Sequence, residues 1–263
     1  HAKIVKTAYR LELKLDLPRF EAINQIGLAS LATLQAELKL ESLAPHPEIV
    51  RILTILSAAA WTNKISPDWG TAEKYARAAV EMAEKLDNPI EMSMGLLALG
   101  NVYFARGLLR ERVQVAQRRL ALTRDPRFFD IRERLSVLKD LGYTLETVGE
   151  FSLALSHFQE AASLAEQVQV VYEQRSLMMH FAHCLFRLDR WDETLQILDQ
   201  TRDMQKRYPR ESAGPECFPI AVAGSVHDRR GELHLGANER AEAHSIMTSI
   251  AGPLDGWVRA QIH

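Results

Sequence analysis

Three side chains of the types that bind metals lie within five residues of one another: His180, His183 and Cys184. Histidines three residues apart share one helix face, and imidazole and thiolate are ligands that zinc accepts. A structural zinc site needs four ligands, however, and no second cluster completes the set. Cys184 is also expected on the packed face of its helix. We therefore interpret the group as a buried cysteine beside partly exposed histidines, and predict no metal.

A second concentration of reactive groups is the arginine-rich segment 105–134, which holds nine arginines against four acidic residues. Guanidinium groups suit carboxylate or phosphate recognition. Such a run is usually a solvated helix face with internal ion pairs. The alternative is docking to an acidic partner or domain, which we favour over nucleic acid because the segment offers few aromatic side chains for stacking on bases. The candidate residues of this secondary basic surface are Arg112, Arg118 and Arg119.

Motifs that position catalytic groups are absent from the sequence. It contains no glycine-rich phosphate loop, no dinucleotide-binding fingerprint, no nucleophile elbow and no HExxH zinc motif. The adjacent Asp192 and Glu193 fall at an expected helix start, where acidic side chains favour the helix dipole. We therefore expect no catalytic residues, no cofactor and no enzymatic activity.

Composition narrows the class of protein further. The 263 residues carry 32 basic and 34 acidic side chains, a net charge of -2, and 47% of them are hydrophobic. Nucleic acids and membrane surfaces attract proteins with a sustained positive field, so neither is an expected partner. No apolar run approaches the length of a membrane span, and only Cys184 and Cys217 occur. These features predict a cytoplasmic protein.

The elements that position these side chains are indicated by an internal repeat. LLALGNVYFARG at 96–107 aligns without a gap with LKDLGYTLETVG at 138–149. The second copy continues into Ala154, Phe158 and Ala161. A similarity at a fixed period is the sequence sign of a helical-repeat protein, in which each helix pair packs on the next.

Two sets of positions keep this register along the chain. Gly or Ala, as required where helix backbones approach closely, recurs at intervals of 42, 42, 40 and 42, at Ala58, Gly100, Gly142, Ala182 and Gly224. Residues suited to leaving a helix follow seven positions after the last four points, at Gly107, Gly149, Asp189 and Gly231. We therefore predict that each first helix ends at these turn positions.

The register predicts one continuous solenoid of five helix pairs, at about 45–90, 91–130, 131–170, 171–210 and 215–252. Residues 1–44 are expected to form an atypical N-terminal helix pair or cap, and 253–263 to begin a further helix. One more period after Gly224 passes beyond His263. We therefore expect the chain to stop inside a repeat, as a module of a longer protein. The alternative is a short C-terminal helix that caps the solenoid.

The order Leu-Gly, aromatic, Ala, aromatic, Ala resembles the tetratricopeptide repeat (TPR) family over about 45–250, most specifically at 96–107 and 135–164. Repeats longer than the usual length of roughly 34 residues are similar to those of kinesin light chains and of sensor domains in bacterial regulators related to the maltose-operon activator. The resemblance implies an all-α, right-handed alpha-alpha superhelix. Its first helices line a concave groove that captures a peptide, a protein or a small effector.

Some positions depart from the family's pattern. Arg112 and Arg119 stand where the next copy has Ala154 and Ala161, and threonines, Thr194 and Thr201, replace the same alanines later. Long arginine stems can lie along apolar surface with their charged ends in water. On that ground we expect Arg112 and Arg119 to face a partner.

The family's groove positions, carried over repeat by repeat, give a mixed apolar and polar lining. Asn101 is the strongest candidate, because a side-chain amide offers both a donor and an acceptor to a ligand backbone; the alternative is an ordinary solvent-facing asparagine. Apolar anchors with polar neighbours suit an extended or helical peptide. The predicted groove residues are Met94, Leu97, Asn101, Phe104, Lys139, Tyr143, Glu146, Met179, His183, Phe186, Arg187, Phe218, Ser225, Asp228 and Arg229.

Two binding functions follow from this pattern. The first is a non-enzymatic scaffold whose groove holds a peptide or partner protein, including other domains of the same full-length protein. The second is an effector-sensing module of a multidomain signalling or transcription regulator. A sensor needs a nucleotide-binding or DNA-binding neighbour in the full-length protein, whereas a scaffold does not.

Overall fold

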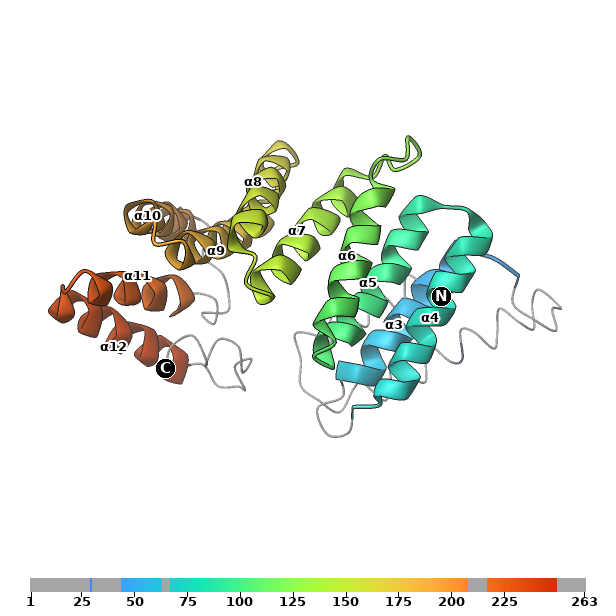
Figure 1. Ribbon diagram of the computed structural model, residues 1–263, viewed down its shortest axis with the longest axis horizontal. Coiled ribbons are helices and arrows are strands. Elements are labelled where there is room, and N and C mark those ends of the chain that lie inside the picture. The colour runs from blue at the N-terminus through green and yellow to red at the C-terminus, as the bar shows by residue number, and fades with distance from the viewer. Residues whose placement is uncertain (1–28, 30–43, 63–66, 208–216, 250–263) are drawn as a thin grey trace. The chain divides into compact units, whose positions relative to one another are not determined.

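Helices make up all the regular structure of the residues that the computed structural model describes, 29, 44–62, 67–207 and 217–249 (Figure 1). The predicted all-α class is therefore confirmed. None of these helices is long and apolar enough to cross a membrane. The helices are α3 (Pro47–Thr62), α4 (Trp69–Leu86), α5 (Pro89–Ala105), α6 (Leu109–Leu122), α7 (Ile131–Thr147), α8 (Phe151–Gln167), α9 (Val171–Arg187), α10 (Trp191–Arg207), α11 (Cys217–Arg229) and α12 (Leu233–Ser249).

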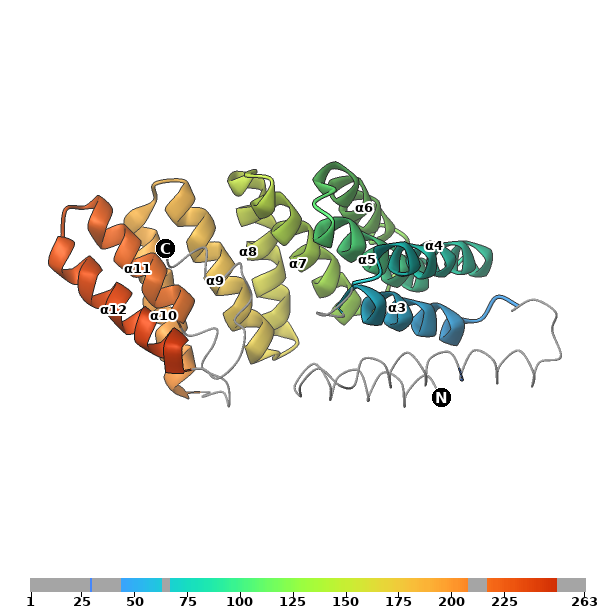
Figure 2. The ribbon, with the colours of Figure 1, turned by 90° about the horizontal axis from the view of Figure 1, so that it is seen from below.

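Contacts join α3 to α4, α5 to α6, α9 to α10 and α11 to α12, and the helices of each of these pairs lie side by side (Figure 2). The contacts divide the chain into two compact units, 1–144 and 145–263. We retain the division into five repeats as a proposal, with these pairs and α7–α8 as its members. The expected N-terminal cap, apart from residues 29 and 44, and the further helix at 253–263 lie outside the described residues.

The α4 helix illustrates how local sequence defines an element. Asp68 precedes it, and its carboxylate accepts a hydrogen bond from the backbone N–H of Thr71 at 2.9 Å, which satisfies one of the free donors of the first turn. One face of the helix is buried and built of small apolar residues. The helix ends at Leu86, and the next residue, Asp87, adopts a left-handed conformation with φ 46°.

The α5 helix begins directly after this turn and is the central element of the first unit. The Asn88 side chain accepts from the backbone N–H of Ile90 at 2.9 Å, and Pro89 occupies the first turn, where no amide donor is needed. The helix contacts α3, α4 and α6. A methyl group at Gly95 would lie 3.1 Å from the backbone nitrogen of Val80, so a glycine lets α4 and α5 approach closely.

Four turns between paired helices share one backbone feature. Gly107, Gly149 and Gly231 have φ of 73°, 87° and 79°, and Asp189 has φ 57°. Side chains disfavour this left-handed region, in which glycine is unstrained and aspartate is tolerated. The predicted helix-leaving positions are therefore confirmed.

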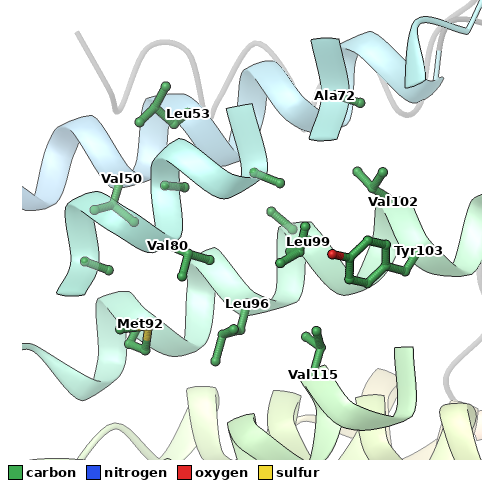
Figure 3. Packing of buried hydrophobic residues seen from close by; sticks show 14 of the residues in the cluster. Val50, Leu53, Ala72, Val80, Met92, Leu96, Leu99, Val102, Tyr103 and Val115 are labelled. Atoms are coloured by element: carbon green, nitrogen blue, oxygen red, sulfur yellow. The ribbon is translucent and has the colours of Figure 1, made fainter. Parts of the chain in front are cut away.

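The core of the first unit lies between α3, α4, α5 and α6 (Figure 3). Leu96 of α5 is 1% exposed, and it packs in one cluster with Val50, Val80, Leu99 and Val115. Burying an apolar side chain of this size stabilises a fold by about 1.5–3 kcal/mol. Truncating Leu96 to alanine would cost about 2–5 kcal/mol, because a cavity remains.

The predicted close-packing points hold in most copies. A methyl group at Gly224 would lie 3.1 Å from the carbonyl oxygen of Gly236, where α11 meets α12. In α3, however, Ala58 is half-buried, and its neighbour Ser57 is fully buried and donates to the carbonyl oxygen of Ala72 at 2.8 Å. In the first copy the buried residue that contacts α4 is therefore Ser57, one position before the predicted point.

The second unit packs α8 to α12 around small and aromatic residues. Ala154, Phe158 and Ala161 of α8 are fully buried. The threonines that replace these alanines in α10 are also fully buried, because the hydroxyl of Thr194 donates to the carbonyl of Arg190 at 2.9 Å and that of Thr201 to Ile197 at 2.8 Å. Each hydroxyl is thus satisfied within its own helix and leaves the packing intact.

Candidate functional site

Arg112 and Arg119, predicted to face a partner, are instead buried in the first unit, with 5% and 0% exposure. Arg118 lies between them, keeps 51% of its side chain exposed and pairs with Glu84 at 2.8 Å. The prediction of a basic surface formed by all three arginines is therefore wrong for Arg112 and Arg119. Their charged ends find buried carboxylates and hydroxyls, which offset the loss of water around a guanidinium.

Arg119 joins three helices through its guanidinium. Its Nη1 donates to Asp140 Oδ2 at 2.7 Å and its Nη2 to Glu133 Oε1 at 2.8 Å, both on α7. Its Nε donates to Ser93 Oγ of α5 at 3.1 Å. Ser93 Oγ in turn donates to Glu133 Oε1 at 2.7 Å. These bonds join α6 to both α5 and α7, and the bond of Ser93 joins α5 to α7 directly.

Arg112 lies two helical turns earlier on α6 and completes the same network. It donates to Asp140 Oδ1, to Thr144 Oγ1 at 3.0 Å and to Asn101 Oδ1 at 3.3 Å. Burial lowers the pKa of the Arg112 guanidinium, while the neighbouring charge of Asp140 acts in the opposite direction. Arginine nonetheless stays protonated in proteins, so the network contains two buried cations held by carboxylates.

The network positions a partly open surface on α5 and α7. Along α5, Met94, Leu97 and Asn101 are half-buried, and Phe104 is 48% exposed. On α7, Lys139 and Tyr143 are half-buried. We call these residues the α5–α7 face: Met94, Leu97, Asn101, Phe104, Lys139 and Tyr143.

In the second unit, Glu146 is buried and receives two histidines. Its Oε2 lies 2.7 Å from His180 Nδ1 and its Oε1 lies 2.5 Å from His183 Nδ1. Burial alone would raise the pKa of Glu146, but the hydrogen bonds to both imidazoles outweigh it and hold the pKa below its usual value. Glu146 and His183, at 9% and 5% exposure, therefore do not line an open groove as predicted, because each satisfies the other.

Two further predicted groove residues belong to the core of the second unit. Met179 and Phe218 are 8% and 1% exposed and cluster with Ala182 and Leu198. The Phe218 ring lies 5.8 Å from the ring of His183. Apolar side chains at these positions gain more from burial between helices than from exposure, so their assignment to a groove is wrong.

The remaining predicted positions of the second unit are wholly or partly open. Arg187 lies over the ring of Phe151 at 4.5 Å, and Arg229 over that of Phe186 at 5.2 Å, both within the range of a cation–π contact. The half-buried Ser225 and Asp228 are engaged within the unit. Ser225 donates to the carbonyl of Ala221 at 3.0 Å, and Asp228 pairs with Arg240.

Cys184 is fully buried, in agreement with its expected place on the packed face. Burial raises the pKa of its thiol, and the nearby charge of Glu146 acts in the same direction. A thiol held in its neutral form is a poor nucleophile and a poor metal ligand. Across the part of the chain that the structure describes, no cluster of three or more His, Cys, Asp or Glu is arranged to hold a metal ion.

The partners of the buried arginines were missed at the level of sequence. A signal was present, since Arg112 and Arg119 are seven residues apart and Glu133 and Asp140 have the same spacing. Side chains seven residues apart lie on one helix face. Two cations and two carboxylates at matching intervals on adjacent helices therefore indicate a ladder of ion pairs rather than a surface.

No protein-family model matches the sequence, and no curated protein matches it. Solved structures do resemble it. A protein from Podosopora anserina, described as a kinesin light chain with nearly identical TPR-like repeats, aligns with a TM-score of 0.64 at 13% identity, over 79% of this chain and 99% of that chain. A Rap protein complexed with Competence and Sporulation Factor aligns with a TM-score of 0.66 at 14% identity, over 94% and 64% of the two chains.

A third similar structure is a signal transduction ATPase with numerous domains and a tetratricopeptide repeat sensor, from Pyrococcus horikoshii. Its TM-score is 0.65 at 16% identity, and the alignment covers 99% of this chain but 43% of that one. Identities this low establish the architecture only. Together with the helix pairs and the shared turns, they show that the chain has the fold of the tetratricopeptide-type helical-repeat proteins.

Proposed function

We propose that the chain is a non-enzymatic interaction module of the cytoplasm, which binds a peptide or partner protein along the first helices of its repeats. The main support for the proposal is the α5–α7 face, where the exposed ring of Phe104 lies beside the half-buried amide of Asn101. Both residues belong to α5, which the hydrogen bond from Ser93 to Glu133 joins to α7. Phe104 is 48% exposed, and aromatic anchors of this kind supply most of the energy of many interfaces.

The charge and rigidity of this face support the proposal. Asp140 of α7 is occupied by two arginines, so that it adds no free negative charge beside Lys139. The buried bonds of Arg119 join α5, α6 and α7, which reduces the ordering cost of binding. An extended peptide with apolar side chains and free backbone carbonyls suits such a surface.

The test begins with peptides selected from a random displayed library on the wild-type chain. Replacing Asn101, Phe104 and Tyr143 together by alanine should weaken binding of the selected peptides at least about tenfold, the loss expected of a hot spot. The matched control is Leu153→Ala, which removes a side chain of 54% exposure from α8 and should leave affinity unchanged. Equal binding by the triple variant and the wild type would sink the proposal.

A second candidate function is effector sensing on behalf of neighbouring domains. It is favoured by the two compact units of the chain and by the likeness to an ATPase whose tetratricopeptide repeats are described as a sensor. A ligand with different affinity for two arrangements of the units would shift their population. The sequence of the full-length gene provides the test, because a sensor requires a nucleotide-binding or DNA-binding region beside this one.

A further inference from the structure

The Arg112 side chain uses its donors on three fixed partners. Nε donates to Thr144 Oγ1 at 3.0 Å, Nη2 to Asp140 Oδ1, and Nη1 to Asn101 Oδ1 at 3.3 Å. The side chain is 6% exposed, and Asp140 beside it is 7% exposed. The guanidinium is therefore held in one orientation by two α7 residues, while its third partner lies on α5.

This contact determines which end of the Asn101 amide is available. A guanidinium has donors only, so the atom of Asn101 that faces it must be the carbonyl oxygen. The opposite end is the NH2 group with two donors, for which the described residues provide no hydrogen-bond partner, and the residue is half-buried. Asn101 thus has donors, and not its acceptor, to offer a ligand.

Gly100 makes room for the guanidinium at this place. A methyl group on Gly100 would overlap Arg112 Nη1 and lie 3.3 Å from Val115 Cγ1. Gly100 therefore does more than bring two helices together. The absence of a side chain leaves space beside the α5 backbone for the Arg112 guanidinium, which reaches Asn101 there.

An aromatic ring adjoins the amide. Phe104 follows Asn101 by three residues, and side chains at this spacing are neighbours on a helix. The Arg112 Cζ lies 5.9 Å from the centroid of the Phe104 ring, within the range of a cation–π contact. The ring stays 48% exposed, so that donors and an open apolar surface lie side by side.

We infer that Arg112 is a positioning residue: it binds the carbonyl oxygen of Asn101, so that the NH2 group of Asn101 is the part that contacts a ligand. The subsite formed by Asn101 and Phe104 therefore binds a hydrogen-bond acceptor flanked by an apolar side chain. The acceptor that fits is a main-chain carbonyl of an extended peptide, whose neighbouring side chain lies on Phe104. This inference rests on the proposed function, because it names the chemical group of a peptide that the α5–α7 face binds.

The test compares two replacements of Asn101 with the library-selected peptides as probes. Asn101→Ala removes one neutral hydrogen bond and should weaken binding roughly twofold to tenfold. Asn101→Asp keeps the shape but has no donor and should weaken binding at least as much. Wild-type affinity in Asn101→Asp would overturn the inference, because an acceptor at this position would then suffice.

A second measurement separates positioning from mere structural support. In the peptides, each amide is replaced in turn by an ester, which weakens the carbonyl as an acceptor. One ester should reduce affinity for the wild type but not for Asn101→Ala or for Gly100→Ala, which displaces Arg112. Gly70→Ala is the control, since a methyl group there meets only the Asp68 side chain at 3.6 Å, and should retain the ester effect.

The two levels of the proposal fail in different ways. If neither Asn101→Ala nor Phe104→Ala changes peptide affinity, the α5–α7 face is not the binding surface and the proposed function fails. If both weaken binding but no ester is coupled to Asn101, the face binds and only the donor assignment is wrong. If the coupling survives in Gly100→Ala, Arg112 does not position Asn101.

Discussion

Arg119 and Asp140 form an ion pair of 2.7 Å in which the guanidinium is 0% exposed and the carboxylate side chain 7% exposed. The other oxygen of Asp140 pairs with Arg112. One carboxylate thus serves two buried cations on the neighbouring helix, and its removal has consequences beyond one lost contact.

Asp140→Asn should destabilise the chain by about 3–5 kcal/mol, the usual cost of leaving buried charges without their partner. The free energy of unfolding in urea measures the effect. Glu84→Gln is the matched control, because it breaks the exposed pair with Arg118 and should cost less than about 1 kcal/mol. Similar small losses in both variants would show that the buried pair contributes little.

Reversing the charge of Arg118 or of Arg119 should have very different effects on stability, because the first side chain is exposed and the second is buried. Arg118→Glu places a carboxylate in water near Glu84 and should change stability by no more than about 1 kcal/mol. Arg119→Glu buries a third carboxylate beside Asp140 and Glu133 and should prevent folding of the first unit. Circular dichroism and thermal unfolding distinguish the two, and a stable Arg119→Glu variant would contradict the buried network.

The buried contact of Glu146 with His180 and His183 should make the free energy of unfolding depend on pH. Because the folded state holds the pKa of Glu146 below its usual value, this carboxylate stabilises the fold at neutral pH, and the contribution is lost as the pH falls through the folded pKa. Glu146→Gln should therefore lose less stability than the wild type between neutral pH and about pH 3. Parallel pH profiles for the two proteins would argue against the bonds to His180 and His183.

Glu91 should show the opposite dependence. It is 3% exposed, and burial raises its pKa although Arg51 acts against the shift. The protonated form is therefore favoured in the folded state, so the contribution to stability is present at low pH and lost as the pH rises through the folded pKa. Unfolding measured in urea at several pH values should show a gain on mild acidification that Glu91→Gln lacks.

The turn residue Asp189 stands where three other turns have glycine. Asp189→Gly should relieve the left-handed conformation at φ 57° and raise stability by less than about 1 kcal/mol, since glycine also has more entropy to lose. The reciprocal change, Gly149→Ala, should cost about 1–2 kcal/mol through backbone strain alone, because no atom lies within 4 Å of the added methyl. Thermal unfolding of both variants checks the sign.

Helices, turns and packed small residues could be predicted from the sequence because they depend on local rules. The 3.6-residue period defines one apolar face, and a left-handed turn requires glycine or a tolerant residue such as Asp189. These rules place Gly107, Gly149 and Gly231 without knowledge of any neighbouring helix. The burial of Cys184 follows in the same way from its position on the packed face.

The surroundings of long polar side chains could be decided only by the tertiary structure. A helical position determines the direction of a Cβ atom, but the end of an arginine lies several bonds further out and its free energy depends on groups from other helices. Arg112 and Arg119 are buried because Asp140 and Glu133 of α7 meet them. The same dependence buries Glu146 with His180 and His183. Local sequence thus determined the helical scaffold, whereas contacts between helices decided which of its polar groups remain open to a partner.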